Sequence, residues 1–249
     1  MAYDAQIVRT KFIPPLPRKR LLVRTRLAEL IEGAVSHKVT ILQAGPGYGK
    51  STVLAVHLSR AGIPSFWYSV NSADTDPRVF ITHLIWSLRA AYPTMGSESL
   101  LLLEENYGPI ARRQAVDLLS NDLLDQIIGD IAIVIDDYHA VAKSPEVSEI
   151  VENLINTVPP QVHLVLSTRE RPSFGSLARW RVRGEALEIT EKDLAFTASE
   201  ISNLFAGPYQ HELTAAQVKV VLERTEGWII ALEMIWHALR EGLSLPELF

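Results

Sequence analysis

The sequence predicts an α/β fold: a P-loop NTPase parallel sheet sandwiched by helices and followed by a small all-helical domain. Apolar strand-like runs alternate with amphipathic helical patterns, which favours right-handed crossovers and a doubly wound sheet. One strand–helix junction carries a glycine-rich phosphate-binding motif, and only helical patterns follow it near the C-terminus. We therefore expect a nucleotide-binding domain over residues 1–196 and a helical domain over residues 197–249.

The motif occupies residues 38–52, KVTILQAGPGYGKST, between a β-branched run and an amphipathic segment. Its glycines let the backbone turn tightly enough to aim several N–H groups at a polyphosphate, in front of a helix N-terminus. We expect Lys50 to reach the β- and γ-phosphates and Ser51 to ligate Mg²⁺. The predicted nucleotide-binding residues of the loop are Ala44, Gly45, Pro46, Gly47, Tyr48, Gly49, Lys50, Ser51 and Thr52.

Local signals place the other elements. Strands are expected over residues 38–43, 65–70, 131–135, 162–167 and 186–189. Helices are expected from Thr25 as an N-cap, over 50–61, after Asp76-Pro77, and from Ser144-Pro145 to Pro159-Pro160. Residues 94–121 indicate helices with a loop near Gly108-Pro109. In the helical domain, capping boxes begin at Thr197 and Thr214, and a third helix is expected over 226–239.

An apolar strand ends in two acids within residues 133–139, IVIDDYH. A strand buried on both faces tolerates an acid only at its C-terminal end, where the cleft of an open α/β sheet lies. Asp136 is predicted to hold Mg²⁺, directly or through water, and Asp137 to orient or activate the attacking water. The alternative is that both acids simply end the strand in a solvated turn.

Arg169 follows the expected strand 162–167. In P-loop ATPases whose sheet inserts a strand between the P-loop strand and the acid strand, a polar residue at this tip senses the γ-phosphate. Arg169 is therefore a candidate catalytic residue that stabilises charge on the transferred phosphate. The alternative is a surface arginine paired with Glu170 or another nearby acid.

Composition excludes several classes of function. With no cysteine among 249 residues, disulfides and thiolate metal sites are impossible, and the seven histidines show no metal-ligand spacing. A net charge of −5 argues against a broad basic face for nucleic acid, so DNA binding would require another part of the protein. Neither a signal peptide nor an apolar run of membrane-spanning length occurs, so a cytoplasmic protein without membrane contact is expected.

Several motifs in order resemble the N-terminal ATPase module of the MalT-like large LuxR-family transcriptional regulators. These regulators are P-loop NTPases of the STAND class, the signal-transduction ATPases with numerous domains. The resemblance runs from about Arg9 to Leu239. The segments that carry it are residues 9–27, 44–52, 133–139, 166–172, 178–200 and 225–234.

The resemblance implies a molecular switch that rests with ADP and exchanges it for ATP when an inducer engages a C-terminal sensor. The ATP state is expected to self-associate and to activate transcription through a terminal helix-turn-helix, and slow hydrolysis, to which the Asp at position 137 contributes, resets it. Val23 and Arg24 match the segment that packs on adenine, and Glu226-Gly227-Trp228 matches a motif that closes over the nucleotide. The sensor and DNA-binding parts are absent from the sequence, so we expect a fragment.

Two other functions fit the same motifs. One is a stand-alone P-loop ATPase or remodelling factor with faster turnover. The other is a degenerate interaction domain that binds nucleotide for structure and never hydrolyses it. Trapped ADP and turnover in minutes would favour the switch over both alternatives.

Overall fold

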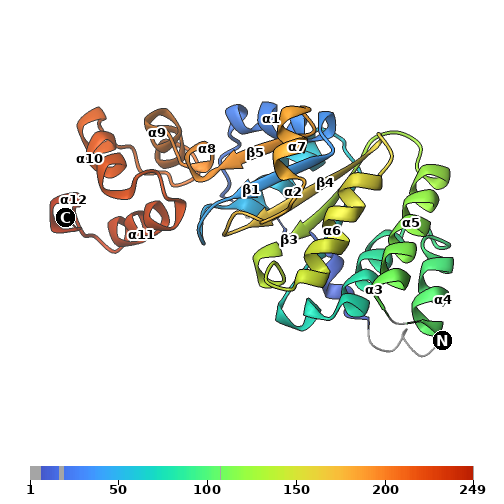
Figure 1. Cartoon of the computed structure of the whole chain (residues 1–249). Helices are drawn as coiled ribbons and strands as arrows, with labels where there is room; N and C mark the ends of the chain where they lie inside the picture. The colour runs from blue at the N-terminus through green and yellow to red at the C-terminus, as the bar shows by residue number, and fades with distance from the viewer. Residues whose placement is uncertain (1–6, 17–19, 107, 249) are drawn as a thin grey trace.

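The computed structural model describes residues 7–16, 20–106 and 108–248. Its centre is a five-stranded sheet in the order β2-β3-β4-β1-β5, in which every neighbouring pair is parallel (Figure 1). The strands are β1 (Val39–Gln43), β2 (Ser65–Ser69), β3 (Ile131–Asp136), β4 (Val162–Thr168) and β5 (Ala186–Thr190). This order inserts β4 between the P-loop strand and the acid strand, so all three strands end at one edge of the sheet.

Helices connect the strands and continue past β5. Those within the α/β part are α1 (Thr25–Glu32), α2 (Lys50–Arg60), α3 (Pro77–Leu88), α4 (Ser97–Glu105), α5 (Pro109–Gln126), α6 (Pro145–Thr157) and α7 (Leu177–Val182). The later helices are α8 (Glu191–Leu194), α9 (Ala198–Ala206), α10 (Ala215–Thr225), α11 (Ile229–Arg240) and α12 (Leu245–Leu248). Short 3₁₀ turns are η2 (Arg9–Phe12), η3 (Gly33–Ser36), η4 (Ser72–Thr75) and η5 (Tyr138–Ala140).

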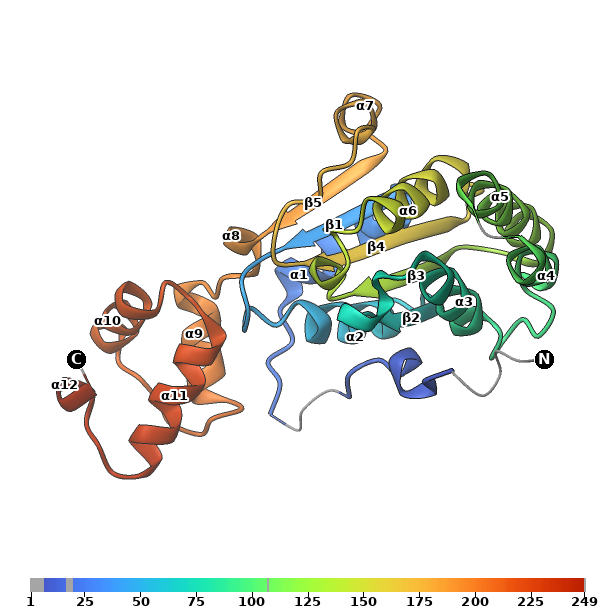
Figure 2. The same ribbon diagram turned by 60° about the horizontal axis from the view of Figure 1, so that its bottom comes forward.

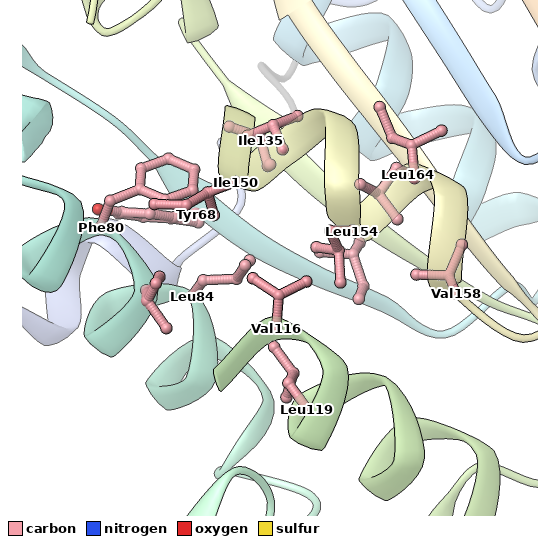
Figure 3. Packing of buried hydrophobic residues seen from close by; sticks show 14 of the residues in the cluster. Tyr68, Phe80, Leu84, Val116, Leu119, Ile135, Ile150, Leu154, Val158 and Leu164 are labelled. Atoms are coloured by element: carbon pink, nitrogen blue, oxygen red, sulfur yellow. The ribbon is translucent and has the colours of Figure 1, made fainter. Parts of the chain in front are cut away.

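Alternating side chains of the central strands bury the two faces of the sheet in separate cores. On β3, Ile133 and Ile135 join the core formed with helices α3, α5 and α6 (Figure 3). Ala132 and Val134 face the opposite core, which contains residues of α1 and α2. Both faces are therefore covered, which is why these strands read as continuous apolar runs.

Helices α9 to α12 form a group with its own core at one end of the sheet (Figures 1 and 2). Within it, Tyr209 stacks on Trp236 with ring centroids 4.6 Å apart. The indole N–H of Trp236 donates to the Tyr209 carbonyl oxygen at 3.0 Å. The predicted architecture, a sandwiched parallel sheet followed by a small helical domain, is thus confirmed, whereas the boundary at residues 196/197 stays a prediction.

Most predicted helix starts are confirmed by the caps that the structure contains. The carboxylate of Asp76 accepts from the Arg78 amide at 2.8 Å, with Pro77 at the first helical position. Capping boxes start α9 at Thr197 and α10 at Thr214. The stretch 94–121 contains α4 and the start of α5, separated by a loop that includes Gly108.

Two helix boundaries differ from the prediction. Thr25 is the first residue of α1 rather than its cap, and the N-cap residue Arg24 makes no side-chain capping bond. The helix expected from residue 226 starts at Ile229 instead. Glu226 and Gly227 adopt left-handed conformations, with φ of 50° and 75°, and the Phe196 amide donates to the Gly227 carbonyl oxygen at 2.9 Å. This turn interrupts the helical register between α10 and α11.

The N-terminal segment is tied to the sheet by one buried ion pair. The Lys11 ammonium contacts the Asp74 carboxylate at 2.5 Å, and Asp74 is fully buried. Phe12 packs edge-on against Tyr68 of β2. Residues 17–19, which belong to the segment 9–27 that carries the resemblance, lie outside the described residues. Over the described ranges, no helix is both long and apolar enough to cross a membrane.

Candidate functional site

The P-loop joins β1 to α2 at the carboxyl edge of the sheet. The Ala44 amide donates to the Thr168 carbonyl oxygen at 3.2 Å, which anchors the loop to the end of β4. Gly47 and Gly49 have φ of +77° and +76°, a region that other residues enter only with strain. These glycines allow the tight turn that delivers the chain to the N-terminus of α2, where free amide groups favour an anion.

Lys50 lies folded against its own loop. Its side-chain ammonium donates to the carbonyl oxygens of Ala44 at 2.8 Å and Gly45 at 3.0 Å. Only 7% of the residue is exposed, and burial lowers the pKa of Lys50 although Asp137 and Asp136 act in the opposite direction. The ammonium is thus held at the loop by carbonyl groups, close to two carboxylates.

Ser51 and Asp136 meet directly. The Ser51 hydroxyl donates to Asp136 Oδ1 at 2.9 Å. Asp136 is 6% exposed, and burial, with the charge of Asp137, raises its pKa against opposing hydrogen bonds that include the one from Ser51. A buried carboxylate beside a hydroxyl fits Mg²⁺, which binds through one or two protein oxygens and keeps several waters. In the described ranges, no group of three or more His, Cys, Asp or Glu residues could hold a metal, so water and phosphate would supply the other ligands.

Asp137 occupies a different environment from its neighbour. It has φ of 58°, a left-handed conformation uncommon outside glycine. Its side chain is 51% exposed, and His139 Nδ1 lies 3.7 Å from Asp137 Oδ1. Burial and the nearby Arg169 lower the pKa of His139, which favours the neutral imidazole. The turn after β3 therefore separates a buried carboxylate, Asp136, from an accessible one, Asp137.

Arg169 follows β4 and is exposed. Its charge acts on Lys50 and His139, which places it on the same side of the sheet as the P-loop. Among the described residues Arg169 forms no salt bridge, with Glu170 or otherwise; Glu170 instead accepts from the Thr168 hydroxyl through its backbone carbonyl, at 2.8 Å. Arg169 is therefore available to an anion at this edge.

A cavity of about 180 Å³ adjoins the P-loop. Three parts of the chain line it: the segment before α1, the P-loop with the first turns of α2, and the helical group. Representative lining residues are Leu22, Arg24, Tyr48, Thr52, Phe196 and Ile229. Val23 instead lines a neighbouring hollow with Leu21 and Trp67, so its predicted adenine contact stays a prediction.

Arg24 connects the segment before α1 to the helical group. Its guanidinium donates to the carbonyl oxygens of Leu194 at 2.6 Å and Ala195 at 2.7 Å, and to the Glu200 carboxylate at 2.9 Å. It also lies 4.0 Å from the centre of the Phe196 ring. Arg24 is 4% exposed and lines the cavity, and its hydrogen bonds connect two segments that form the cavity wall.

Two contacts to the P-loop were not predicted. The Gly45 amide donates to a Glu191 carboxylate oxygen at 3.0 Å. The Trp228 indole N–H donates to the Pro46 carbonyl oxygen at 3.0 Å. Burial and Glu191 also raise the pKa of Tyr48 within the loop. The motif Glu226-Gly227-Trp228 pointed to the nucleotide, but no local pattern distinguishes Glu191 from other surface acids.

The chain is similar to known proteins in both sequence and structure. No family profile matches the chain. The serine/threonine-protein kinase PknK of Mycobacterium tuberculosis is 29% identical over 245 residues, covering 96% of this chain and 21% of the kinase. The HTH-type transcriptional regulator MalT of Yersinia pestis is 27% identical over 248 residues, covering 97% of this chain and 26% of the regulator. The chain thus spans only 21% to 26% of these relatives' length.

Solved structures share the fold. A STAND protein with a tetratricopeptide repeat sensor from Pyrococcus horikoshii matches with a TM-score of 0.61 at 16% identity, covering 90% of this chain and 31% of that one. The Walker-type ATPase of Pyrococcus abyssi matches with a TM-score of 0.55 at 14% identity, covering 93% and 71%. The predicted resemblance is confirmed: this chain has the P-loop NTPase fold of a STAND protein and is similar over nearly its whole length to part of the MalT-like regulators.

Proposed function

We propose that this chain is an ATP/ADP-binding switch module of a STAND signal-transducing transcriptional regulator. The observation that carries the proposal is the contact between the Ser51 hydroxyl and the buried Asp136 carboxylate at 2.9 Å, beside Lys50. A nucleotide with its phosphates at the P-loop would extend its base into the adjoining cavity. That cavity has walls from both domains, which supports a binding event that both domains sense.

Each polar residue at the carboxyl edge of the sheet has a separate role at the phosphates. Lys50 exchanges its two backbone carbonyl partners for the β- and γ-phosphates, because a phosphate offers the ammonium a full charge. Ser51 and Asp136 hold Mg²⁺, which neutralises phosphate charge when bound. Asp137 orients the attacking water, and Arg169 contacts the transferred phosphate. The side chain of Asp137 is 51% exposed, so water from the solvent can reach its carboxylate.

The wider role follows from the relatives' printed names and from the resemblance. Hydrolysis would return the module to an ADP-bound resting state, and the ATP state would self-associate in the full regulator. DNA would be bound only by another domain, because this chain carries a net charge of −5. We place the protein in the cytoplasm, where a transcriptional regulator reaches DNA. We also propose a domain boundary at residues 196/197, close to the point where the chain passes from a sheet core, which includes Leu194, to the helical core, which includes Phe196.

The nucleotide itself provides the first test. Native protein is purified without added nucleotide and denatured, and the released small molecules are identified by mass spectrometry. ADP near one equivalent, with turnover over minutes, is expected for a resting switch. A site empty of nucleotide together with turnover many times per second would favour the stand-alone ATPase.

Lys50→Ala provides the second test, because it removes the main cationic partner of the polyphosphate. We expect calorimetry on nucleotide-stripped protein to show ADP and ATP affinity reduced by about a hundredfold or more, as for loss of a charged hydrogen-bonding group. Lys38→Ala is the matched control, since Lys38 precedes β1 at the opposite edge and contacts Glu185 at 3.4 Å. Unchanged affinity in Lys50→Ala would refute the proposed site.

A further inference from the structure

We propose that His57 hydrogen-bonds the base of the nucleotide and thereby determines base preference. This inference rests on the proposed nucleotide-binding function and deepens it by assigning a residue to the base. His57 is on the third turn of the P-loop helix α2 and lines the cavity next to the P-loop.

The side chain of His57 is buried without a hydrogen bond. The residue is 4% exposed. Within the described part of the chain neither ring nitrogen contacts a donor or acceptor of the protein, whereas the buried rings of His83 and His163 both do. The ring nitrogens of His57 are not among the fully buried side-chain atoms that lack a partner, so they keep some exposure, and His57 lines the cavity. A ligand in the cavity would give the His57 ring the partner that the protein does not supply.

Position along α2 matches the base rather than the phosphates. Thr52, Val53, Val56 and His57 recur at the three- and four-residue spacing that places side chains on one helix face, and all four line the cavity. From Lys50 to His57 the helix rises about 10 Å, a distance comparable with the separation of phosphate and base in a nucleotide. Val53 and Val56 supply an apolar floor for a flat ring, and His57 is the polar group at its far end.

Charges around His57 favour the form of the ring that suits a neutral base. Burial lowers its pKa, and the nearby cations Arg60 and Arg24 lower it further, against the weaker opposite effect of Glu32. A neutral imidazole has one N–H donor and one nitrogen acceptor. Purine bases present donors and acceptors on their edges, and adenine and hypoxanthine differ in their arrangement. The ring can therefore distinguish one base from another.

The test compares ADP, inosine diphosphate and inorganic pyrophosphate on nucleotide-stripped protein by calorimetry. We expect His57→Phe to weaken ADP binding by about fivefold, the effect of one neutral hydrogen bond, and to reduce the preference for ADP over inosine diphosphate by a similar factor. Pyrophosphate, which has no base, should bind as in the unaltered protein. His57→Gln, which keeps a donor and an acceptor, should retain most of the ADP affinity.

His83→Phe is the matched control, because it is the same substitution at a buried histidine in the core on the other side of the sheet. It should leave the ratio of ADP to inosine diphosphate affinity unchanged. If His57→Phe keeps the full base preference, or weakens pyrophosphate as much as ADP, the assignment of His57 is wrong and the P-loop site stands. If unaltered protein binds none of the three ligands, the proposed function fails and this inference with it.

Discussion

Gly47→Ala probes the contact between the P-loop and the helical domain. A Cβ at Gly47 would lie 2.9 Å from Trp228 Nε1 and would overlap the side chain of Ile230 on α11. The backbone there has φ of +77°, which costs about 1–2 kcal/mol for an L-residue. Overlap with a packed side chain adds about 1–3 kcal/mol. We therefore expect Gly47→Ala to lower the free energy of unfolding by about 2–5 kcal/mol.

Gly49→Ala separates the two contributions. Gly49 has nearly the same φ, +76°, but nothing lies within 4 Å of an added Cβ. This variant should lose only the strain, about 1–2 kcal/mol. Combining Gly47→Ala with Ile230→Ala should recover the overlap term, so the double-mutant cycle should give a coupling of about 1–3 kcal/mol.

The assay is urea unfolding followed by tryptophan fluorescence, in EDTA and without nucleotide, so that ligand binding does not contribute. Equal losses for Gly47→Ala and Gly49→Ala, with no coupling to Ile230, would refute the reasoning. That result would mean that α11 does not pack against the P-loop in solution.

Three further predictions concern the buried charges. Asp136→Asn should abolish Mg²⁺-dependent hydrolysis, measured as phosphate release. It should also raise the melting temperature in metal-free buffer, because burial raises the Asp136 pKa and the ionised carboxylate therefore destabilises the folded state above that pKa. This increase in melting temperature should shrink at acid pH, where the carboxylate of the unaltered protein is protonated. Arg24→Lys should lower the free energy of unfolding in urea by about 3–5 kcal/mol, because an ammonium cannot make the hydrogen bonds that the guanidinium donates to two carbonyl oxygens and to Glu200. A decrease in the free energy of unfolding of less than about 1 kcal/mol would contradict this prediction. Burial acts to raise the Glu200 pKa, but hydrogen bonds from Arg24 and the Thr197 amide outweigh burial and lower the pKa. The ionised Glu200 therefore stabilises the folded state above about pH 4.3, and this stabilisation is lost as pH falls through the folded-state pKa. Glu200→Gln should therefore show a smaller fall in unfolding free energy between neutral pH and pH 3 than unaltered protein, and identical pH profiles would exclude the effect.

Sequence reasoning succeeded where the signal is local. The cap at Asp76, the glycines of the P-loop and the apolar run of β3 each determine structure within a few residues. The position of β4 between the other two strands was used as a condition for assigning Arg169, and the sheet order satisfies it.

The features that the sequence did not predict depend on contacts between distant segments. Arg24 meets Glu200 across 176 positions of sequence, and Trp228 meets Pro46 across 182. No periodicity encodes such pairings, because they arise from how distant segments pack; the motif Glu226-Gly227-Trp228 pointed to the nucleotide but not to its partner Pro46. The start of the helix at Ile229 was missed for a similar reason: the preceding turn is fixed by its hydrogen bond to Phe196.

The position of Arg24 has a consequence for biosynthesis. Its partners Leu194, Ala195 and Glu200 are translated some 170 residues after it. On the ribosome, domains fold from the N-terminus onward. The guanidinium of Arg24 therefore has no carboxylate partner until Glu200, in about the last fifth of the described chain, has been translated. The wall of the cavity that Arg24 forms is therefore completed late in translation, and a nascent chain that stalls before residue 194 lacks all three of these partners of Arg24.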